Sequence, residues 1–170
     1  MSVARALASV VLLPVLLAGG IAEGVELPKR RSGIWEVATA QTGGAAGPSA
    51  QLCIDEKTDD LAKQLAAGSI FCSRMDVRRE GDRYIADSVC RIGDTTATSR
   101  TVFTGNFSSG YTADIQAKYS PPLMGMSEGY STITARWLGP CKTGMRPGDL
   151  ILPNGTTINV FDTPARPPGK

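Results

Sequence analysis

The sequence predicts a mainly β protein, built as a strongly curved antiparallel meander or a partly closed barrel with one short α-helix and two disulfides. Many short runs alternate apolar and polar residues, and they follow one another at intervals of 10 to 20 residues. This pattern is typical of antiparallel strands joined by short turns. One stretch has a helical period instead, and the four cysteines suit two bridges. A length of 170 residues fits one folded domain.

The first 22 residues have the pattern of a secretory signal peptide. Arg5 is their only charged residue, residues 6–22 are apolar or small, and Glu23 is the first acid. We expect cleavage just before Glu23. A retained membrane anchor is the alternative, but the apolar run is short for a membrane span, and Pro14 interrupts it.

The predicted strands follow one another along the rest of the chain. They are residues 33–41, 51–54, 71–79, 83–91, 95–105, 111–119 and 128–138. Residues 106–110 are predicted as a turn. Residues 120–125 are predicted as a loop, because adjacent prolines do not fit a central strand.

The predicted helix covers residues 55–68, with the sequence DEKTDDLAKQLAAG. Asp55 or Thr58 is a suitable N-cap, acids occupy the first turn, and Gly68 suits the C-terminal end. Leu61 and Leu65 share one face, so this face should pack against the sheet.

Two cysteines stand at the open end of a predicted hairpin. With residues 80–82 as its loop, Cys72 faces Cys90, and Val77 faces Ile85 on the apolar side. A directly opposed antiparallel pair has the Cα separation that a disulfide needs. We therefore predict a Cys72–Cys90 bridge. The remaining pair, Cys53 and Cys141, would join the start of the helix to the end of the last long strand.

Four segments are expected along the chain. They are a signal peptide (1–22), a β-rich domain (23–145), a C-terminal hairpin extension (146–162) and a disordered tail (163–170). Asn154-Gly155 is the turn signal of the extension.

Charge and composition argue against several classes of function. Removal of residues 1–22 takes away Arg5 and no acid, so the formal net charge falls from +2 to +1. Such a chain has no electrostatic attraction to nucleic acid or to an anionic membrane. The chain has no histidine, which rules out histidine-based triads and histidine-ligated metals. Its paired acids stand at the predicted helix start, where they complement the dipole. We predict no catalytic residue, no cofactor and no metal site.

One alternating face is the candidate binding surface. Residues 111–119 place Tyr111, Ile115 and Tyr119 on one side, and the strand at 128–138 places Ile133 and Trp137 on its inner side. Packed core is the commoner use of such a face. The alternative is the wall of a cavity for an apolar ligand, for which the alanines at 113 and 117 leave room.

Several segments, in this order, resemble the family known as domain of unknown function 3617, exported proteins of Gram-negative bacteria. They are GIWEV (33–37), QLCI before an acidic stretch (51–60), CSRMDVRREGDRY (72–84), Cys90, GPC (139–141) and RPGDLILPNGT (146–156). The resemblance implies a periplasmic β-rich domain and carries no catalytic residues.

We therefore expect a non-enzymatic periplasmic domain that binds a small apolar ligand or an envelope component. One alternative is a periplasmic inhibitor of a protease or lysozyme that presents a rigid loop, either 120–128 or 42–50. Another is Cu(I) binding by the thioethers of Met124 and Met126, since soft ligands select this ion.

Overall fold

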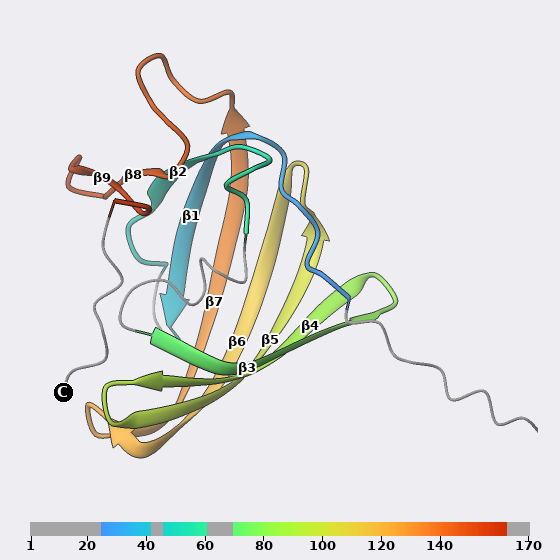
Figure 1. The fold of residues 1–170 in the computed structure, drawn as a ribbon, viewed down its shortest axis with the longest axis vertical. Helices are drawn as coiled ribbons and strands as arrows, with labels where there is room; N and C mark the ends of the chain where they lie inside the picture. Colours follow the sequence, from blue (N-terminus) through green and yellow to red (C-terminus); the bar gives the residue numbers. More distant parts are fainter. Residues whose placement is uncertain (1–24, 42–45, 61–69, 163–170) are drawn as a thin grey trace, which may run out of the picture.

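The part of the chain that the structure describes forms one antiparallel sheet of nine strands in the order β3-β4-β5-β6-β7-β1-β2-β8-β9 (Figure 1). The structure, a computed structural model, describes residues 25–41, 46–60 and 70–162. The strands are β1 (Gly33–Gln41), β2 (Ala50–Ile54), β3 (Ile70–Glu80), β4 (Arg83–Ile92), β5 (Thr95–Asn106), β6 (Gly110–Leu123), β7 (Met126–Gly139), β8 (Asp149–Ile151) and β9 (Thr157–Asn159). The mainly β prediction is confirmed.

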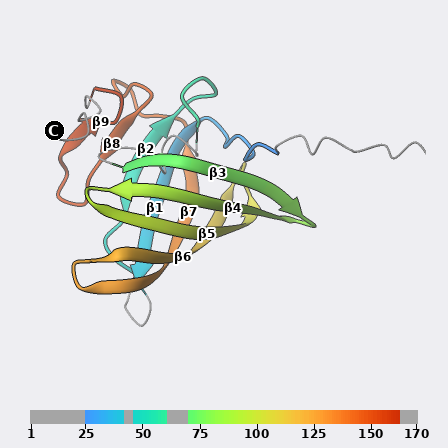
Figure 2. The same ribbon diagram turned by 60° about the horizontal axis from the view of Figure 1, so that its bottom comes forward.

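The sheet is strongly curved and open. In Figure 1, β1 and β7 run nearly vertically, whereas β3 and β4 cross nearly horizontally below them, and Figure 2 shows the same sweep from another side. In the described part of the chain, β3 and β9 have a strand neighbour on one side only, so the barrel does not close. No helix long and apolar enough to cross a membrane occurs among the described residues.

The core occupies part of the concave face. It gathers Trp35 and Phe103, which are almost fully buried, with side chains from β2, β4, β6, β7 and the β5–β6 turn. Phe107 from this turn stacks on Tyr111, with 5.0 Å between the ring centroids. The remaining buried members are Leu52, Ile54, Ala86, Ala113 and Ala135. Apolar burial on this face is the main stabilising contribution of the fold.

The predicted helix is not seen in the described residues. Asp55 to Asp60 form a turn, in which the Asp55 carboxylate accepts hydrogen bonds from the backbone N–H groups of Lys57 and Thr58. Such a side-chain bond offers the backbone an alternative to the helix. Asp55 therefore caps a turn and not the helix that was predicted. The rest of the predicted helix, 61–68, lies outside the described residues.

The hairpin of β3 and β4 has a shorter loop than predicted. Glu80 pairs with Arg83, which leaves a two-residue turn with Gly81 at φ 65°. The register shifts after Cys72, so that one extra residue is absorbed in a bulge and Cys72 still faces Cys90. Val77 consequently faces Ala86, and the predicted partner Ile85 was wrong. The predicted loop was one residue too long, and the bulge was not predicted. These two errors offset each other, so the predicted pairing of Cys72 with Cys90 is correct.

The prediction of a loop at 120–125 was also wrong in part. β6 continues through Pro121 and Pro122 to Leu123, and Met124-Gly125 alone form the turn to β7. The prolines lie where the β6–β7 register shifts and beyond the last residue that β5 pairs. Proline is tolerated at such a position because no ladder hydrogen bond needs its missing N–H.

The C-terminal hairpin forms as β8 and β9. Its turn contains the predicted Asn154-Gly155, and β8 pairs with β2. This hairpin therefore extends the same sheet instead of standing apart from it.

Candidate functional site

A row of small residues crosses the concave face from β4 to β7. Ser88 of β4 lies opposite Ser99 of β5, and Ser99 lies opposite Ala117 of β6. Ala117 in turn lies opposite Gly129 of β7. Directly opposed residues of antiparallel neighbours have their Cβ atoms about 5 Å apart, so the row is continuous. We call the depression along Ser88, Ser99 and Ala117 the trough.

Larger side chains border the trough on both sides. The pair Thr101 and Ile115 forms one wall, next to the core. The pair Ala97 and Tyr119 forms the other wall, continued by the disulfide. The remaining lining residues are Cys72, Met75, Ala86, Cys90 and Ile92, and the hollow between them has a volume of about 170 Å³. It is an apolar slot with a few hydroxyl groups.

The trough has two distinct ends. Met75 of β3 lies opposite Ser88 and stands at one end. At the other end the Tyr119 ring lies over Gly129, because a Cβ atom added to this glycine would be 3.0 Å from the Tyr119 hydroxyl. A side chain at position 129 would press on this ring, so Gly129 and Tyr119 close the trough at β7.

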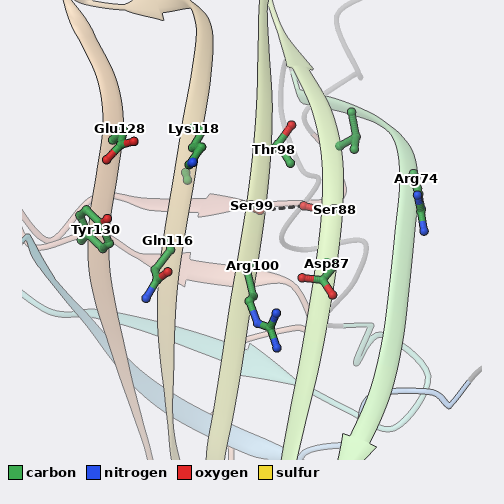
Figure 3. Close-up of a pocket in the computed structure, with 12 residues that line it drawn as sticks. Arg74, Asp87, Ser88, Thr98, Ser99, Arg100, Gln116, Lys118, Glu128 and Tyr130 are labelled. Atoms are coloured by element: carbon green, nitrogen blue, oxygen red, sulfur yellow. Dashed lines mark hydrogen bonds between the residues drawn. The ribbon is translucent and has the colours of Figure 1, made fainter.

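Two serine hydroxyls form the floor of the trough. Ser88 Oγ and Ser99 Oγ are hydrogen-bonded at 2.8 Å, a link between β4 and β5 that is drawn in Figure 3. Ser88 Oγ also lies 3.7 Å from Cys90 Sγ, which carries no hydrogen because it is part of a disulfide. Each hydroxyl has one hydrogen and two lone pairs, so the serine pair keeps one hydrogen that it does not use internally.

The predicted wall residues have three different environments. Tyr111 is buried in the core, and Ile133 packs against it. Ile115 and Tyr119 line the trough and are partly exposed. Trp137 lies near the C-terminal end of β7, and its cross-strand partner is Trp35 of β1. The structure therefore brings two of the five predicted residues together in a hollow and assigns the others to different roles.

A buried ion pair closes the core at the other end of the concave face. Arg30 donates to Asp59 through Nε at 2.8 Å and Nη2 at 2.7 Å, and its backbone N–H also donates to the same carboxylate. Both side chains are almost fully buried. The Tyr111 hydroxyl accepts from Arg30 at 3.5 Å. Burial raises the pKa of Tyr111, and the nearby Arg30 partly opposes this rise.

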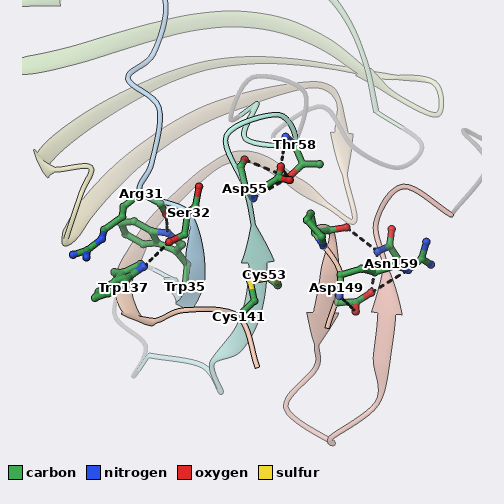
Figure 4. Close-up of a disulfide and its surroundings, with 12 residues drawn as sticks. Arg31, Ser32, Trp35, Cys53, Asp55, Thr58, Trp137, Cys141, Asp149 and Asn159 are labelled. Atoms are coloured by element: carbon green, nitrogen blue, oxygen red, sulfur yellow. Dashed lines mark hydrogen bonds and ion pairs between the residues drawn. A yellow bond between two sulfur atoms is a disulfide. The ribbon is translucent and has the colours of Figure 1, made fainter. Parts of the chain in front are cut away.

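The two tryptophans hold the segment that precedes β1. Trp35 Nε1 donates to the Arg31 carbonyl at 2.8 Å, and Trp137 Nε1 donates to the Ser32 carbonyl at 3.1 Å (Figure 4). The Arg31 guanidinium carbon lies 3.7 Å from the centroid of a Trp137 ring. Trp137 is thus occupied by a contact with the protein's own chain, which argues against a role in a ligand wall.

The disulfide Cys53–Cys141 joins β2 to the segment after β7, as predicted (Figure 4). Nearby, the Thr58 hydroxyl and backbone N–H lower the pKa of Asp55. Hydrogen bonds from the Asn159 amide and the Arg146 backbone lower the pKa of Asp149. Asp55 thus acts as a local hydrogen-bond acceptor in a turn, and Asp149 does so at the start of β8.

The outer face carries a larger and more polar groove. Its volume is about 450 Å³, and it crosses β3 to β7 (Figure 3). Asp87, Arg100, Gln116 and Tyr130 are successive cross-strand neighbours along it. Arg78 bonds Asp87 and Glu80, and these carboxylates raise the pKa of Arg78. Charges of both signs alternate in this groove, so it defines no clear class of ligand.

The described residues contain no group of three or more histidine, cysteine, aspartate or glutamate side chains that could hold a metal ion. Met124 and Met126 both stand at the tip of the β6–β7 hairpin, 91% and 53% exposed. Binding of Cu(I) by these two thioethers stays a prediction.

Sequence reasoning missed two features of the concave face. It did not single out Arg30 and counted Asp59 among the acids of the first turn of the predicted helix, yet the two form the buried pair. No local pattern reveals a contact between residues 29 positions apart. The serine row was also missed, although alternating alanines and serines in residues 86–90 and 97–99 were a usable signal.

An open, disulfide-bridged antiparallel sheet with an apolar hollow on its concave face is the class of protein that this geometry defines. Residues 30–141 match the family model described as a protein of unknown function, DUF3617, and the chain belongs to this family. No curated protein and no solved structure matches the chain.

Proposed function

We propose that this protein is a non-enzymatic domain that binds a small apolar ligand in the trough. The observation that carries the proposal is a change of environment along one face of β6. Tyr111 and Ala113 are buried in the core, whereas Ile115, Ala117 and Tyr119 on the same side of the strand are only partly buried. Together with Ala97 and the Cys72–Cys90 bridge, these residues line an apolar hollow. A mainly apolar lining with a few polar groups is the usual character of small-molecule sites.

The available reactive groups support a binding role over catalysis. The chain has no histidine, and the described cysteines are joined in disulfides. Asp55, Asp59 and Asp149 are engaged as turn or ion-pair acceptors. Turnover of a substrate that is lost on substitution of one Asp or Glu would overturn the non-enzymatic assignment.

The proposed compartment is the periplasm. Two disulfides suit an oxidising compartment, and the N-terminal pattern suits export. The intact mass of the native protein tests this. We expect a chain that begins near Glu23, and a mass that includes residues 1–22 would contradict export with cleavage.

The binding experiment uses parinaryl alcohol, a neutral unbranched chain whose conjugated double bonds fluoresce more strongly in apolar surroundings. We expect enhancement with the native protein and its loss in Ala117→Trp, because the indole fills the trough. Gln116→Trp is the matched control, since it adds the same ring to the opposite face of β6. Equal enhancement in all three proteins would exclude the trough as the site. Organic extracts of the native protein, analysed by mass spectrometry, would identify the bound molecule.

A second candidate function rests on the β6–β7 tip. Pro121 and Pro122 are exposed, Met124 is 91% exposed, and the tip extends beyond the last residue paired with β5. This shape suits a rigid loop inserted into the cleft of a protease or lysozyme. Inhibition of such an enzyme by the native protein, and its loss in Met124→Asp, is the expected result. Unchanged inhibition in Met124→Asp would remove the tip from consideration.

A further inference from the structure

The serine pair on the floor of the trough narrows the class of ligand. Resting on the proposed function, we infer that the trough takes one unbranched alkyl chain carrying a single hydroxyl or carbonyl oxygen, and that Ser88 and Ser99 hold this oxygen. The inference comes from the shape of the slot and from the unused hydrogen-bonding capacity at its floor.

The shape is that of a single chain. Ile115 and Tyr119, the two walls on β6, are four residues apart, so their Cα atoms are separated by about 13 Å. The side chains of Ile115 and Tyr119 flank Ala117 on the same face of β6. The slot between them is therefore only as wide as the space above this small residue. Lengthwise, the slot crosses from Met75 on β3 to Ala117 on β6, which is three strand spacings or about 14 Å. A long, narrow slot accommodates an alkyl chain and excludes a branched or fused-ring group.

The chemistry of the floor requires one polar atom in the ligand. Ser88 is 9% exposed, so its hydroxyl lies in largely apolar surroundings. The bond between Ser88 Oγ and Ser99 Oγ uses one of their two hydrogens, and the disulfide sulfur of Cys90 is only a weak acceptor for the other. A purely apolar ligand would cover this hydrogen without satisfying it, which is unfavourable. A ligand oxygen placed there accepts the hydrogen bond.

Among the residues that the structure describes, no charged side chain lines the trough. Its hydrogen-bonding groups are the hydroxyls of Ser88, Ser99, Thr101 and Tyr119. A carboxylate or ammonium group would therefore be buried here without an opposite charge, which is strongly unfavourable. This favours a neutral alcohol, aldehyde or ester oxygen over the ionised head group of a fatty acid.

Three eight-carbon probes test the inference on the full mature protein. They are 1-octanol, its branched isomer 2-ethyl-1-hexanol, and n-octane, and binding is followed by NMR shifts of the Ala97 and Ala117 methyl groups. We expect 1-octanol to bind at least about threefold more tightly than its isomer. Ser88→Ala with Ser99→Ala should weaken 1-octanol binding about three- to tenfold and should not weaken n-octane binding, because no hydroxyl hydrogen is then left unsatisfied. Thr98→Ala, on the outer face of β5, is the control.

The outcomes separate the two proposals. If none of the probes shifts the alanine methyl groups, the trough is no ligand site and the proposed function fails. If 1-octanol and n-octane both bind and the serine substitutions weaken neither, the trough is a site but the oxygen anchor is wrong. Equal affinity for the two alcohols overturns the single-chain shape. Should the double variant fail to fold, Ser99→Ala alone gives the same test, because Ser99 provides half of the pair.

Discussion

At the scale of single residues, Arg30 and Asp59 form the ion pair with the greatest consequence. Their side chains are 2% and 1% exposed, and the carboxylate also accepts the Arg30 backbone N–H. A buried pair adds little net stability compared with apolar residues, but loss of one partner leaves an uncompensated charge in the core. Asp59 therefore fastens the segment before β1 to the turn after β2.

We predict that Asp59→Ala lowers the free energy of unfolding by about 3–5 kcal/mol, because Arg30 would remain buried and charged. The exposed pair Arg74–Asp76 supplies the control, and Asp76→Ala should cost less than about 1 kcal/mol. Urea denaturation measures both. A double variant, Arg30→Met with Asp59→Leu, should recover most of the loss, and equal costs for the two single variants would contradict this account.

Gly33 is a second residue whose type is set by its surroundings. Its φ is 135°, and an added Cβ would lie 2.2 Å from the Gly139 carbonyl oxygen. We predict that Gly33→Ala costs about 1–3 kcal/mol more than Gly139→Ala. Gly139 has nearly the same φ, 140°, but an added Cβ there has no neighbour within 4 Å. Thermal unfolding of the two variants isolates the steric clash from the backbone strain, and equal melting temperatures would argue against the clash.

At the scale of elements, the two disulfides constrain the chain very differently. Cys72–Cys90 closes a hairpin with a sequence separation of 18, whereas Cys53–Cys141 joins β2 to the end of β7 with a separation of 88. In the chain-entropy account, a bridge stabilises by restricting the unfolded chain, and the effect grows with the length of the loop.

We predict that Cys53→Ser with Cys141→Ser destabilises the protein more than Cys72→Ser with Cys90→Ser. The chain-entropy relation gives about 4–5 kcal/mol for the long loop and about 3 kcal/mol for the short one. Guanidinium denaturation of the two double variants tests the order. A larger loss from the hairpin bridge would mean that native packing around Cys72 and Cys90, including the trough wall, outweighs the chain entropy.

The β8–β9 hairpin provides a prediction on pH. The Asn159 amide lowers the pKa of Asp149, followed by the Arg146 backbone N–H. An aspartate whose folded pKa is depressed stabilises the fold above its unfolded pKa of about 3.9, and this stabilisation is lost as the pH falls through the folded pKa. Asn159→Ala should raise the pKa of Asp149 towards the ordinary value. NMR titration of the carboxyl carbons measures this, with Asp55 as the internal reference. An unchanged Asp149 would assign the shift to Arg146 instead.

At the scale of the whole molecule, the order of strands makes the sheet depend on distant contacts. β1 lies between β2 and β7, and its residue Glu36 pairs with Arg136, 100 positions later. The core is therefore complete only when the first and last long strands meet. The C-terminal hairpin is not needed for the contact between β1 and β7, and β8 pairs with β2 at only two positions.

We predict that a chain of residues 23–145 folds by itself. It keeps both disulfides, β1 to β7 and the trough, and it loses the contacts of Leu150 and Val160 with the core. Burial of two half-exposed aliphatic side chains is worth about 2–3 kcal/mol in total, so stability should fall by this amount. Near-ultraviolet circular dichroism and denaturation check the prediction. An unfolded product would show that β8 and β9 are an essential part of the domain.

Some features of this protein follow from its sequence alone, because short-range geometry decides them. The strands arise from a period of two residues, and the tight hairpin turns are marked by glycine or asparagine close to their true place. The Cys72–Cys90 bridge was predictable because a hairpin brings its two ends together whichever small loop it uses. The Cys53–Cys141 bridge followed because only one other pair remained.

Other features were decided only by the tertiary structure. The face of residues 111–119 looked uniform in sequence, yet it divides between Tyr111 in the core and Tyr119 in the trough. Trp35 and Leu52 from distant strands belong to the same buried cluster as Tyr111 and Ala113. Ile115, Ala117 and Tyr119 are not among the buried members of this cluster. In the sequence, Asp59 has the position of an acid at a helix start. In the structure it is buried, because it pairs with Arg30, which lies 29 residues earlier. Local propensity determines where a strand runs, but long-range packing determines which part of its face stays open to a ligand.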